Sequence, residues 1–197
     1  MSARIAVTIA GSDSGGGAGI QADLKSFSAN GVYGASVITA LTAQNTLGVQ
    51  AIQDIPPAFI AAQIDSVFSD LRVDAVKIGM LSQVPVIEAV AAGLARHAAR
   101  NIVVDPVMVA TSGDRLLSEG AAGSLKRLLF PLASVITPNL HEAAALLDTG
   151  VAASEDDMVD QARRLLALGP AAVLIKGGHG DGPEAVDLLL TGDGVSR

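Results

Sequence analysis

Short apolar segments alternate with segments of helical periodicity along the whole chain, and this alternation restricts the fold more than any other feature. Such alternation is typical of βαβ units, which build a mostly parallel sheet with helices on its faces. The expected strands cover residues 4–10, 35–41, 49–55, 74–78, 101–105, 134–137, 172–176 and 185–190. The expected helices cover 19–30, 57–71, 84–97, 118–130 and 154–169, with a short one after 138–139. The sequence therefore predicts an α/β fold.

The 197 residues contain no internal repeat, linker or low-complexity tract, which predicts one domain over residues 1–197. Half of the residues are hydrophobic, which is enough for a sizeable core without disulfide bonds, and the chain has no cysteine. The lack of cysteine fits a reducing compartment, and the N-terminus shows no targeting signal, so we expect a cytoplasmic protein. Residues 26–53 carry no charge, but polar side chains interrupt them, so no membrane span is expected.

The charge balance excludes several partners. Thirteen basic and twenty acidic residues give a formal net charge of −7, which argues against a nucleic-acid or anionic membrane surface. A chain of this charge can handle phosphate only with glycine amides, a few placed cations and a metal ion. We therefore expect a small-molecule ligand, with no nucleic acid and no membrane as partner.

Glycine, proline and charged residues lie at the carboxyl ends of five of the expected strands. In open α/β sheets, ligands bind outside the carboxyl ends of the strands. Turns also need glycine, proline and aspartate, but an Asp and a Lys at the ends of apolar strands favour a ligand cleft over simple turns. The five positions are Gly11, Gly79-Met80, Asp105-Pro106, Pro138-Asn139 and Lys176-Gly177.

The loop of residues 11–19 is rich in glycine and precedes the first expected helix. Its backbone can approach a ligand closely because most of its residues lack a Cβ atom. It does not end in the Lys-Ser/Thr of a P-loop. Gly17, Gly19 and Ala22 match the dinucleotide-binding pattern G-x-G-x-x-A, but no acidic residue follows about twenty positions later to hold a ribose. A nicotinamide-dependent oxidoreductase is therefore a weak alternative.

Two polar residues near this loop have both a structural and a functional interpretation. Asp23 lies in the first turn of the expected helix, where a carboxylate is favourable on electrostatic grounds alone, but it could also accept a hydrogen bond from a substrate hydroxyl. Gln44, followed by Asn45, could bind the edge of a heterocycle or simply satisfy backbone groups. The residues by themselves leave both questions open.

Three charged residues form a second set of candidates. Asp105 and Glu142 could hold Mg²⁺ through water, although Asn139 with Glu142 three residues later is also a helix capping box. Lys176 ends an apolar strand, and we expect its ammonium group to reach nucleotide phosphates, because a lysine there needs an anion or solvent.

Taken together, six segments resemble one family. They are AGSDSGGGAGIQADL (10–24), TALTAQNT (39–46), KIGML (77–81), DPVM (105–108), TPNLHEA (137–143) and KGGH (176–179). In this order they are similar to the hydroxymethylpyrimidine/phosphomethylpyrimidine kinases of thiamine biosynthesis, in the ribokinase-like superfamily. The resemblance implies a three-layer fold with a mostly parallel central sheet, and a homodimer. It also implies ATP- and Mg²⁺-dependent phosphorylation of 4-amino-5-hydroxymethyl-2-methylpyrimidine and then of its monophosphate, giving the diphosphate.

The resemblance also assigns roles to matching residues. The pyrimidine site would be lined by Gly11, Asp23, Gln44, Met80 and Val107, with Gln44 on the aminopyrimidine edge and Met80 and Val107 near the ring. ATP would be bound by Asp105, Asn139, Glu142 and Lys176, and Mg²⁺ would be held through water by Asp105 and Glu142.

One departure from the family concerns the end of the chain. Family members continue into a Gly-Thr-Gly-Cys-Thr or Gly-Thr-Gly-Asp type motif that forms an anion hole and supplies the catalytic Cys or Asp. This sequence ends at Arg197, so we expect the C-terminal part of the fold to be absent and assign no catalytic residue. Two alternatives stay open: a pyridoxal/pyridoxine kinase of the same fold, and a catalytically inactive pyrimidine-binding fragment.

Overall fold

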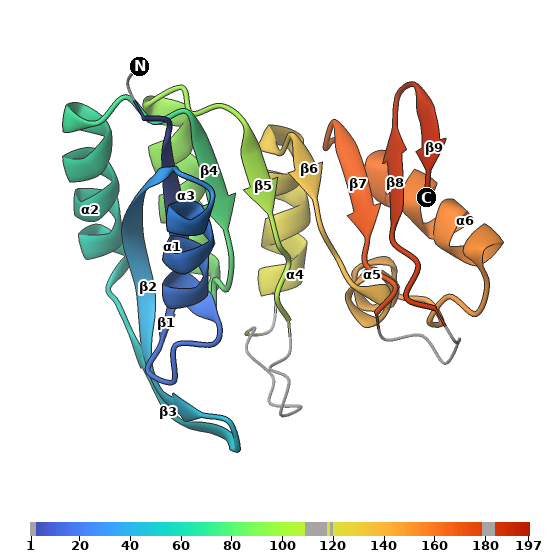
Figure 1. Ribbon diagram of the computed structural model, residues 1–197, viewed down its shortest axis with the longest axis horizontal. Helices are drawn as coiled ribbons and strands as arrows, with labels where there is room; N and C mark the ends of the chain where they lie inside the picture. Colours follow the sequence, from blue (N-terminus) through green and yellow to red (C-terminus); the bar gives the residue numbers. More distant parts are fainter. Residues whose placement is uncertain (1–2, 109–117, 119, 179–183) are drawn as a thin grey trace.

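Nine strands form a single sheet in the computed structural model, which describes residues 3–108, 118, 120–178 and 184–197 (Figure 1). The strand order is β3-β2-β1-β4-β5-β6-β7-β8-β9. Neighbours from β2 to β7 pair in parallel, whereas β3, β8 and β9 join by antiparallel pairing. The predicted, mostly parallel sheet is thus confirmed. The strands are β1 Ile5–Asp13, β2 Tyr33–Asn45, β3 Gly48–Asp54, β4 Ala75–Ile78, β5 Ile102–Val104, β6 Val135–Ile136, β7 Ala172–Ile175, β8 Leu188–Thr191 and β9 Gly194–Ser196.

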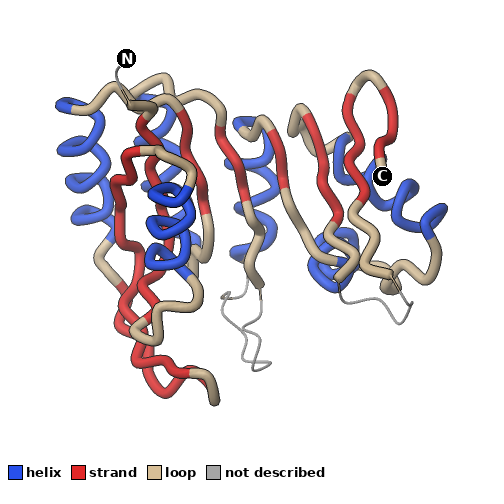
Figure 2. The backbone as a smooth tube through the Cα atoms, in the orientation of Figure 1, coloured by secondary structure: helices blue, strands red, loops and turns tan. Residues whose placement is uncertain are grey.

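Helices cover both faces of this sheet, as predicted. They are α1 Gly19–Ala29, α2 Pro57–Asp70, α3 Val84–Arg96, α4 Ala121–Ser124, α5 Leu140–Leu147 and α6 Glu155–Leu166. Figure 2 shows α1 in front of the strands and α2 and α3 behind them. The alternation of side chains along β1 explains this arrangement, since Thr8 contacts α1 while Val7 and Ile9 belong to the core cluster that contains Ile60 of α2. None of the helices in the described ranges is long and apolar enough to cross a membrane.

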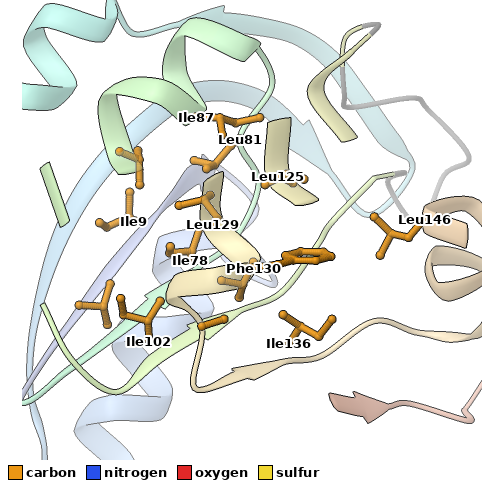
Figure 3. Packing of buried hydrophobic residues seen from close by; sticks show 14 of the residues in the cluster. Ile9, Ile78, Leu81, Ile87, Ile102, Leu125, Leu129, Phe130, Ile136 and Leu146 are labelled. Atoms are coloured by element: carbon orange, nitrogen blue, oxygen red, sulfur yellow. The ribbon is translucent and has the colours of Figure 1, made fainter. Parts of the chain in front are cut away.

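The core consists almost entirely of aliphatic side chains. Figure 3 shows the ring of Phe130 among isoleucines and leucines such as Leu129 and Ile136, all of them fully buried. Branched aliphatic residues on the parallel strands pack against the helical layer that contains α2 and α3, so few aromatic residues are needed. This rigid core fixes the strand ends where the polar residues lie.

The sequence-based boundaries need three corrections. The first two expected strands extend to Asp13 and Asn45, because β2 continues into a hairpin with β3 that projects beyond the central strands (Figure 1). The helix expected from Ser118 begins at Ala121, since Gly120 with its φ of 80° breaks the helix there, and it continues as a π turn and a 3₁₀ turn to Leu132. The last expected strand, 185–190, is β8, which begins only at Leu188, and the unpredicted β9 pairs with it in an antiparallel hairpin. His179, in the 176–179 motif, lies outside the described residues.

Candidate active site

A cavity of roughly 330 Å³ opens at the carboxyl ends of β1, β2, β4 and β5. All five residues predicted for the pyrimidine site line it: Gly11, Asp23, Gln44, Met80 and Val107. They come from four strand ends and from α1, and they are brought together because parallel strands end at the same edge of the sheet. The structure therefore places the whole predicted substrate set in one cavity, and its ligand stays a prediction.

Asp23 projects from α1 toward the sheet, where two residues hold its carboxylate. Thr8 Oγ1 donates a hydrogen bond to Asp23 Oδ2 at 2.6 Å, and Lys77 Nζ lies 3.1 Å from the same oxygen. Thr8 and Lys77 are neighbours in the β1–β4 register, so both side chains leave the sheet on the α1 face. This network was not predicted from the sequence, although a polar residue in the middle of each of two apolar strands could have indicated it.

The glycine loop is organised by Asp13, a buried carboxylate whose role was not predicted from the sequence. Asp13 Oδ1 accepts from Gly15 N at 2.7 Å, while Oδ2 accepts from Gly17 N at 2.9 Å and from Ala18 N at 2.8 Å. An internal carboxylate therefore already binds these three backbone amides, so they are not available to a ligand. The loop instead forms one wall of the cavity.

Gly19 marks a close approach between this loop and the end of β1. Its φ is +56°, and a Cβ atom at this position would lie 2.3 Å from the carbonyl oxygen of Gly11. Backbone cannot move aside as a flexible side chain can, so only glycine fits here. This contact fixes the loop against the strand end that carries Gly11.

We expect Gly19→Ala to lower the free energy of unfolding by more than about 2 kcal/mol, since a left-handed backbone costs about 1–2 kcal/mol and the clash adds to it. Gly31→Ala is the matched control, because Gly31 also has a positive φ (+71°) but open space where a Cβ would lie. Urea unfolding measures both. Equal destabilisation by the two substitutions would contradict the role given to the Gly11 contact.

A second cluster lies at the ends of β5, β6 and β7. Lys176 Nζ contacts Asp105 Oδ1 at 2.8 Å, and Thr137 Oγ1 donates to the same oxygen at 3.1 Å. Asn139 pairs with Lys176 through an isolated β-bridge. The anion that Lys176 meets here is thus the Asp105 carboxylate, and Asp105 also lines the cavity, so it connects the cluster with the pyrimidine site.

Glu142 joins this cluster from the first turn of α5. Its Oε2 accepts from Asn139 N at 2.8 Å, and its own N donates to Asn139 Oδ1 at 2.8 Å, which confirms the predicted capping box. Burial is the main cause that raises the pKa of Glu142; the Asn139 N–H and the Lys176 charge oppose this shift, and the Asp105 charge adds to it. Glu142 therefore lies within electrostatic reach of both Asp105 and Lys176.

The donor set of this cluster fits Mg²⁺ only in part. Carboxylate oxygens of Asp105 and Glu142 are the hard ligands that Mg²⁺ prefers. The described part of the chain contains no group of three or more acidic or histidine side chains that could hold a metal ion. Two carboxylates suit an ion that keeps several waters, as Mg²⁺ does when it also binds substrate phosphates.

The raised pKa of Glu142 leads to a stability prediction. A carboxyl group whose pKa is higher in the folded than in the unfolded state stabilises the fold below its unfolded pKa, and this contribution is lost as the pH rises through the folded pKa. We therefore expect Glu142→Gln to raise the free energy of unfolding at pH 7 relative to wild type, and to lose this advantage at about pH 4. Glutamine can still serve the capping box. Urea unfolding at both pH values tests this, and a variant that is less stable at pH 7 would contradict it.

A comparison with known proteins identifies the family. A family model described as phosphomethylpyrimidine kinase matches residues 13–197. The chain belongs to this family. It is 58% identical over 192 residues to the hydroxymethylpyrimidine/phosphomethylpyrimidine kinase of Escherichia coli (strain K12), covering 98% of this chain and 72% of that relative. Membership makes the protein a small-molecule kinase, as the sequence resemblance implied.

Solved structures agree with this assignment. The crystal structure of phosphomethylpyrimidine kinase from Clostridium difficile 630 matches with a TM-score of 0.90 at 49% identity, covering 98% of this chain and 83% of that one. An ADP complex of Bacillus subtilis pyridoxal kinase matches with a TM-score of 0.90 at 40% identity, covering 99% and 74%. The fold is thus the predicted ribokinase-like one, and pyridoxal kinases are more distant relatives.

Proposed function

We propose that this protein transfers phosphate from ATP to 4-amino-5-hydroxymethyl-2-methylpyrimidine and then to the resulting monophosphate. The observation that carries the proposal is the cavity that gathers Gly11, Asp23, Gln44, Met80 and Val107 in a chain 58% identical to the E. coli kinase named for both steps. A cavity of this volume suits a single heterocycle with a short substituent.

The chemistry of the lining residues supports this substrate. Gln44 offers a carboxamide, whose donor and acceptor groups match the edge of an aminopyrimidine. Met80 Cε would lie only 2.7 Å from a Cβ at position 11, so Gly11 leaves room for the thioether beside the cavity. Met80 and Val107 would pack on the ring, and the Asp23 carboxylate would accept a hydrogen bond from the substrate hydroxyl.

The nucleotide would be bound by Asp105, Asn139, Glu142 and Lys176. Lys176 would exchange its contact with Asp105 for nucleotide phosphates, and Asp105 and Glu142 would hold Mg²⁺ through water. Bound Mg²⁺ supplies neutralisation of the phosphate charge, and the remaining catalysis is positioning. No described residue is proposed as the catalytic base.

The proposal is tested by ADP release with the pyrimidine alcohol and with its monophosphate, using a chain extended past Arg197. We expect turnover with both acceptors and weaker turnover with pyridoxal. Pyridoxal is included as the second candidate substrate because the chain is 40% identical to a pyridoxal kinase. Calorimetry on the 197-residue chain measures pyrimidine binding separately. Binding without turnover in both chains would favour a pyrimidine-binding protein without kinase activity, and preference for pyridoxal would reverse the order of the two candidates.

We also propose a homodimer in the cytoplasm. The dimer rests on the family resemblance and is supported by exposed apolar side chains on the projecting β2–β3 hairpin, namely Leu41, Leu47 and Ile52. Light scattering during size-exclusion chromatography gives the molar mass, and a monomer at micromolar concentration would contradict this part of the proposal. The cytoplasmic location rests on the cysteine-free composition.

A further inference from the structure

Lys77 is a charged residue in the cavity wall. Neither the sequence motifs nor the proposed function assigns it a role. It lies inside β4 between Val76 and Ile78, both fully buried in the core on the opposite face. A lysine in such a strand is costly unless its ammonium meets an anion or water. Here the ammonium meets Asp23 at 3.1 Å, and both side chains line the cavity.

The space around the Lys77 ammonium depends on a neighbouring glycine. A Cβ at Gly79 would lie 3.0 Å from Lys77 Nζ and 2.9 Å from the Cβ of Ala10. The ammonium group therefore lies beside the backbone at the carboxyl end of β4, one residue before Met80. An ammonium has three N–H donors. Asp23 is its one hydrogen-bond partner within the described residues, so further donors are available to a ligand in the cavity.

Stability does not explain this ion pair. The side chains of Lys77 and Asp23 are 24% and 16% exposed, so both charges are largely removed from water. For such pairs the desolvation cost offsets most of the Coulombic attraction, and apolar replacements are often as stable. This charge pair adds little stability and faces a ligand cavity, which indicates a role in ligand specificity.

The two acceptors of the proposed reaction differ mainly in charge. The first is a neutral alcohol, whereas a phosphate monoester carries about −1.5 to −2 charges at pH 7. The unpaired carboxylate of Asp23 would repel the second acceptor strongly in a cavity of low dielectric constant. With Lys77 beside it, the pair has no net charge, and the same wall can face either acceptor.

We infer that Lys77 is a specificity-determining residue that lets one cavity bind both the neutral alcohol and the anionic monophosphate, by compensating the charge of Asp23. The inference rests on the proposed function, because that function supplies the two acceptors. It concerns relative affinity for the two ligands, which can be measured apart from turnover.

The test measures the ratio of the two dissociation constants, monophosphate over alcohol, by calorimetry. Lys77→Gln removes the positive charge but keeps an amide donor for Asp23, and we expect this ratio to rise about tenfold. Asp23→Asn removes the negative charge and keeps an acceptor for Thr8, and we expect the ratio to fall by a similar factor. The double variant, in which both charges are absent, is expected to return close to the wild-type ratio. Lys126→Met is the control for loss of a lysine, since Lys126 binds the carbonyl of Leu146 away from the cavity.

A purely structural role for Lys77 predicts a different pattern. In that case Lys77→Gln weakens binding of both ligands equally, and an unmoved ratio in this variant overturns the inference. If Lys77→Gln does not fold, the nearly isosteric Asp23→Asn decides, because an unchanged or increased ratio there contradicts charge compensation. A wild-type protein that binds neither ligand contradicts the proposed function itself, whereas binding of both with unmoved ratios in the variants contradicts only this inference.

Discussion

Asp13→Asn is expected to lower kcat/KM for the pyrimidine about a hundredfold and the free energy of unfolding by about 2 kcal/mol. Both carboxylate oxygens of Asp13 accept backbone hydrogen bonds, one from Gly15 and two from Gly17 and Ala18. An asparagine amide has one oxygen, so either orientation turns an NH₂ group toward a backbone N–H. The side chain keeps its size, and the loss therefore measures the charge and the acceptor alone.

The functional effect follows from the position of this loop. Gly11, Ala18 and Gly19 line the cavity together with Asp13, so a displaced loop moves one wall of the substrate site. Displacements of about 1 Å are enough to reduce catalysis about a hundredfold when they misplace a reacting group. Kinetics on the chain extended past Arg197 and urea unfolding of the 197-residue chain give the two quantities.

Asp193→Asn is the matched control, because Asp193 is exposed in the turn between β8 and β9 and is not among the residues that line the cavity. We expect it to change both quantities little. If Asp13→Asn is as active and as stable as this control, the loop does not depend on the Asp13 carboxylate.

Most of the fold could be predicted from the sequence because its central parallel strands are rich in apolar residues, with buried side chains alternating with partly buried ones. Runs such as residues 102–104 and 172–175 are continuously apolar, and helical periodicity separates them. The end of β2 was underestimated, since three of the residues 42–45 are polar and apolar runs cannot mark such a strand, whereas the strand expected at 49–55 is β3. The start of the helix after Gly120 was placed too early. Its first residue is set by the left-handed backbone conformation of Gly120, which the sequence does not show.

The site residues at strand ends could be predicted from the sequence. The residues whose roles depend on contacts with other side chains or with the backbone were missed. Gly11, Met80 and Asp105 lie at or near the carboxyl ends of strands, and the parallel topology alone brings them to one edge. The role of Asp13 depends on the conformation of a turn that includes Gly15, two residues away. The role of Lys77 depends on its contact with Asp23, 54 residues away. No pattern along the sequence reveals either contact. The same limit explains why Asp105 was not predicted as a partner of Lys176, since the two residues are 71 positions apart in the sequence.

Asp105 connects the cavity with the second cluster, so its replacement is expected to have the largest effect on phosphate transfer. In Asp105→Asn, the ammonium of Lys176 loses the charge it contacts at 2.8 Å, and the proposed Mg²⁺ site loses one of two carboxylates. We expect kcat/KM for ATP to fall about a hundredfold to a thousandfold, the range seen when one preorganised electrostatic contact is removed.

The same variant should change the titration of Glu142 in a defined direction. The Asp105 charge is one of the causes that raise the pKa of Glu142, so its removal should bring this pKa closer to the usual value, which NMR titration of the carboxyl group can measure. Thr137→Val is the control, because it removes only the neutral hydrogen bond to Asp105 Oδ1 and leaves the charge in place; we expect a loss of about tenfold or less. An Asp105→Asn enzyme as active as Thr137→Val, with an unshifted Glu142, would show that Asp105 acts on neither the nucleotide nor Glu142. A large loss of activity together with a lower Glu142 pKa would instead place both carboxylates in one electrostatic unit with Lys176.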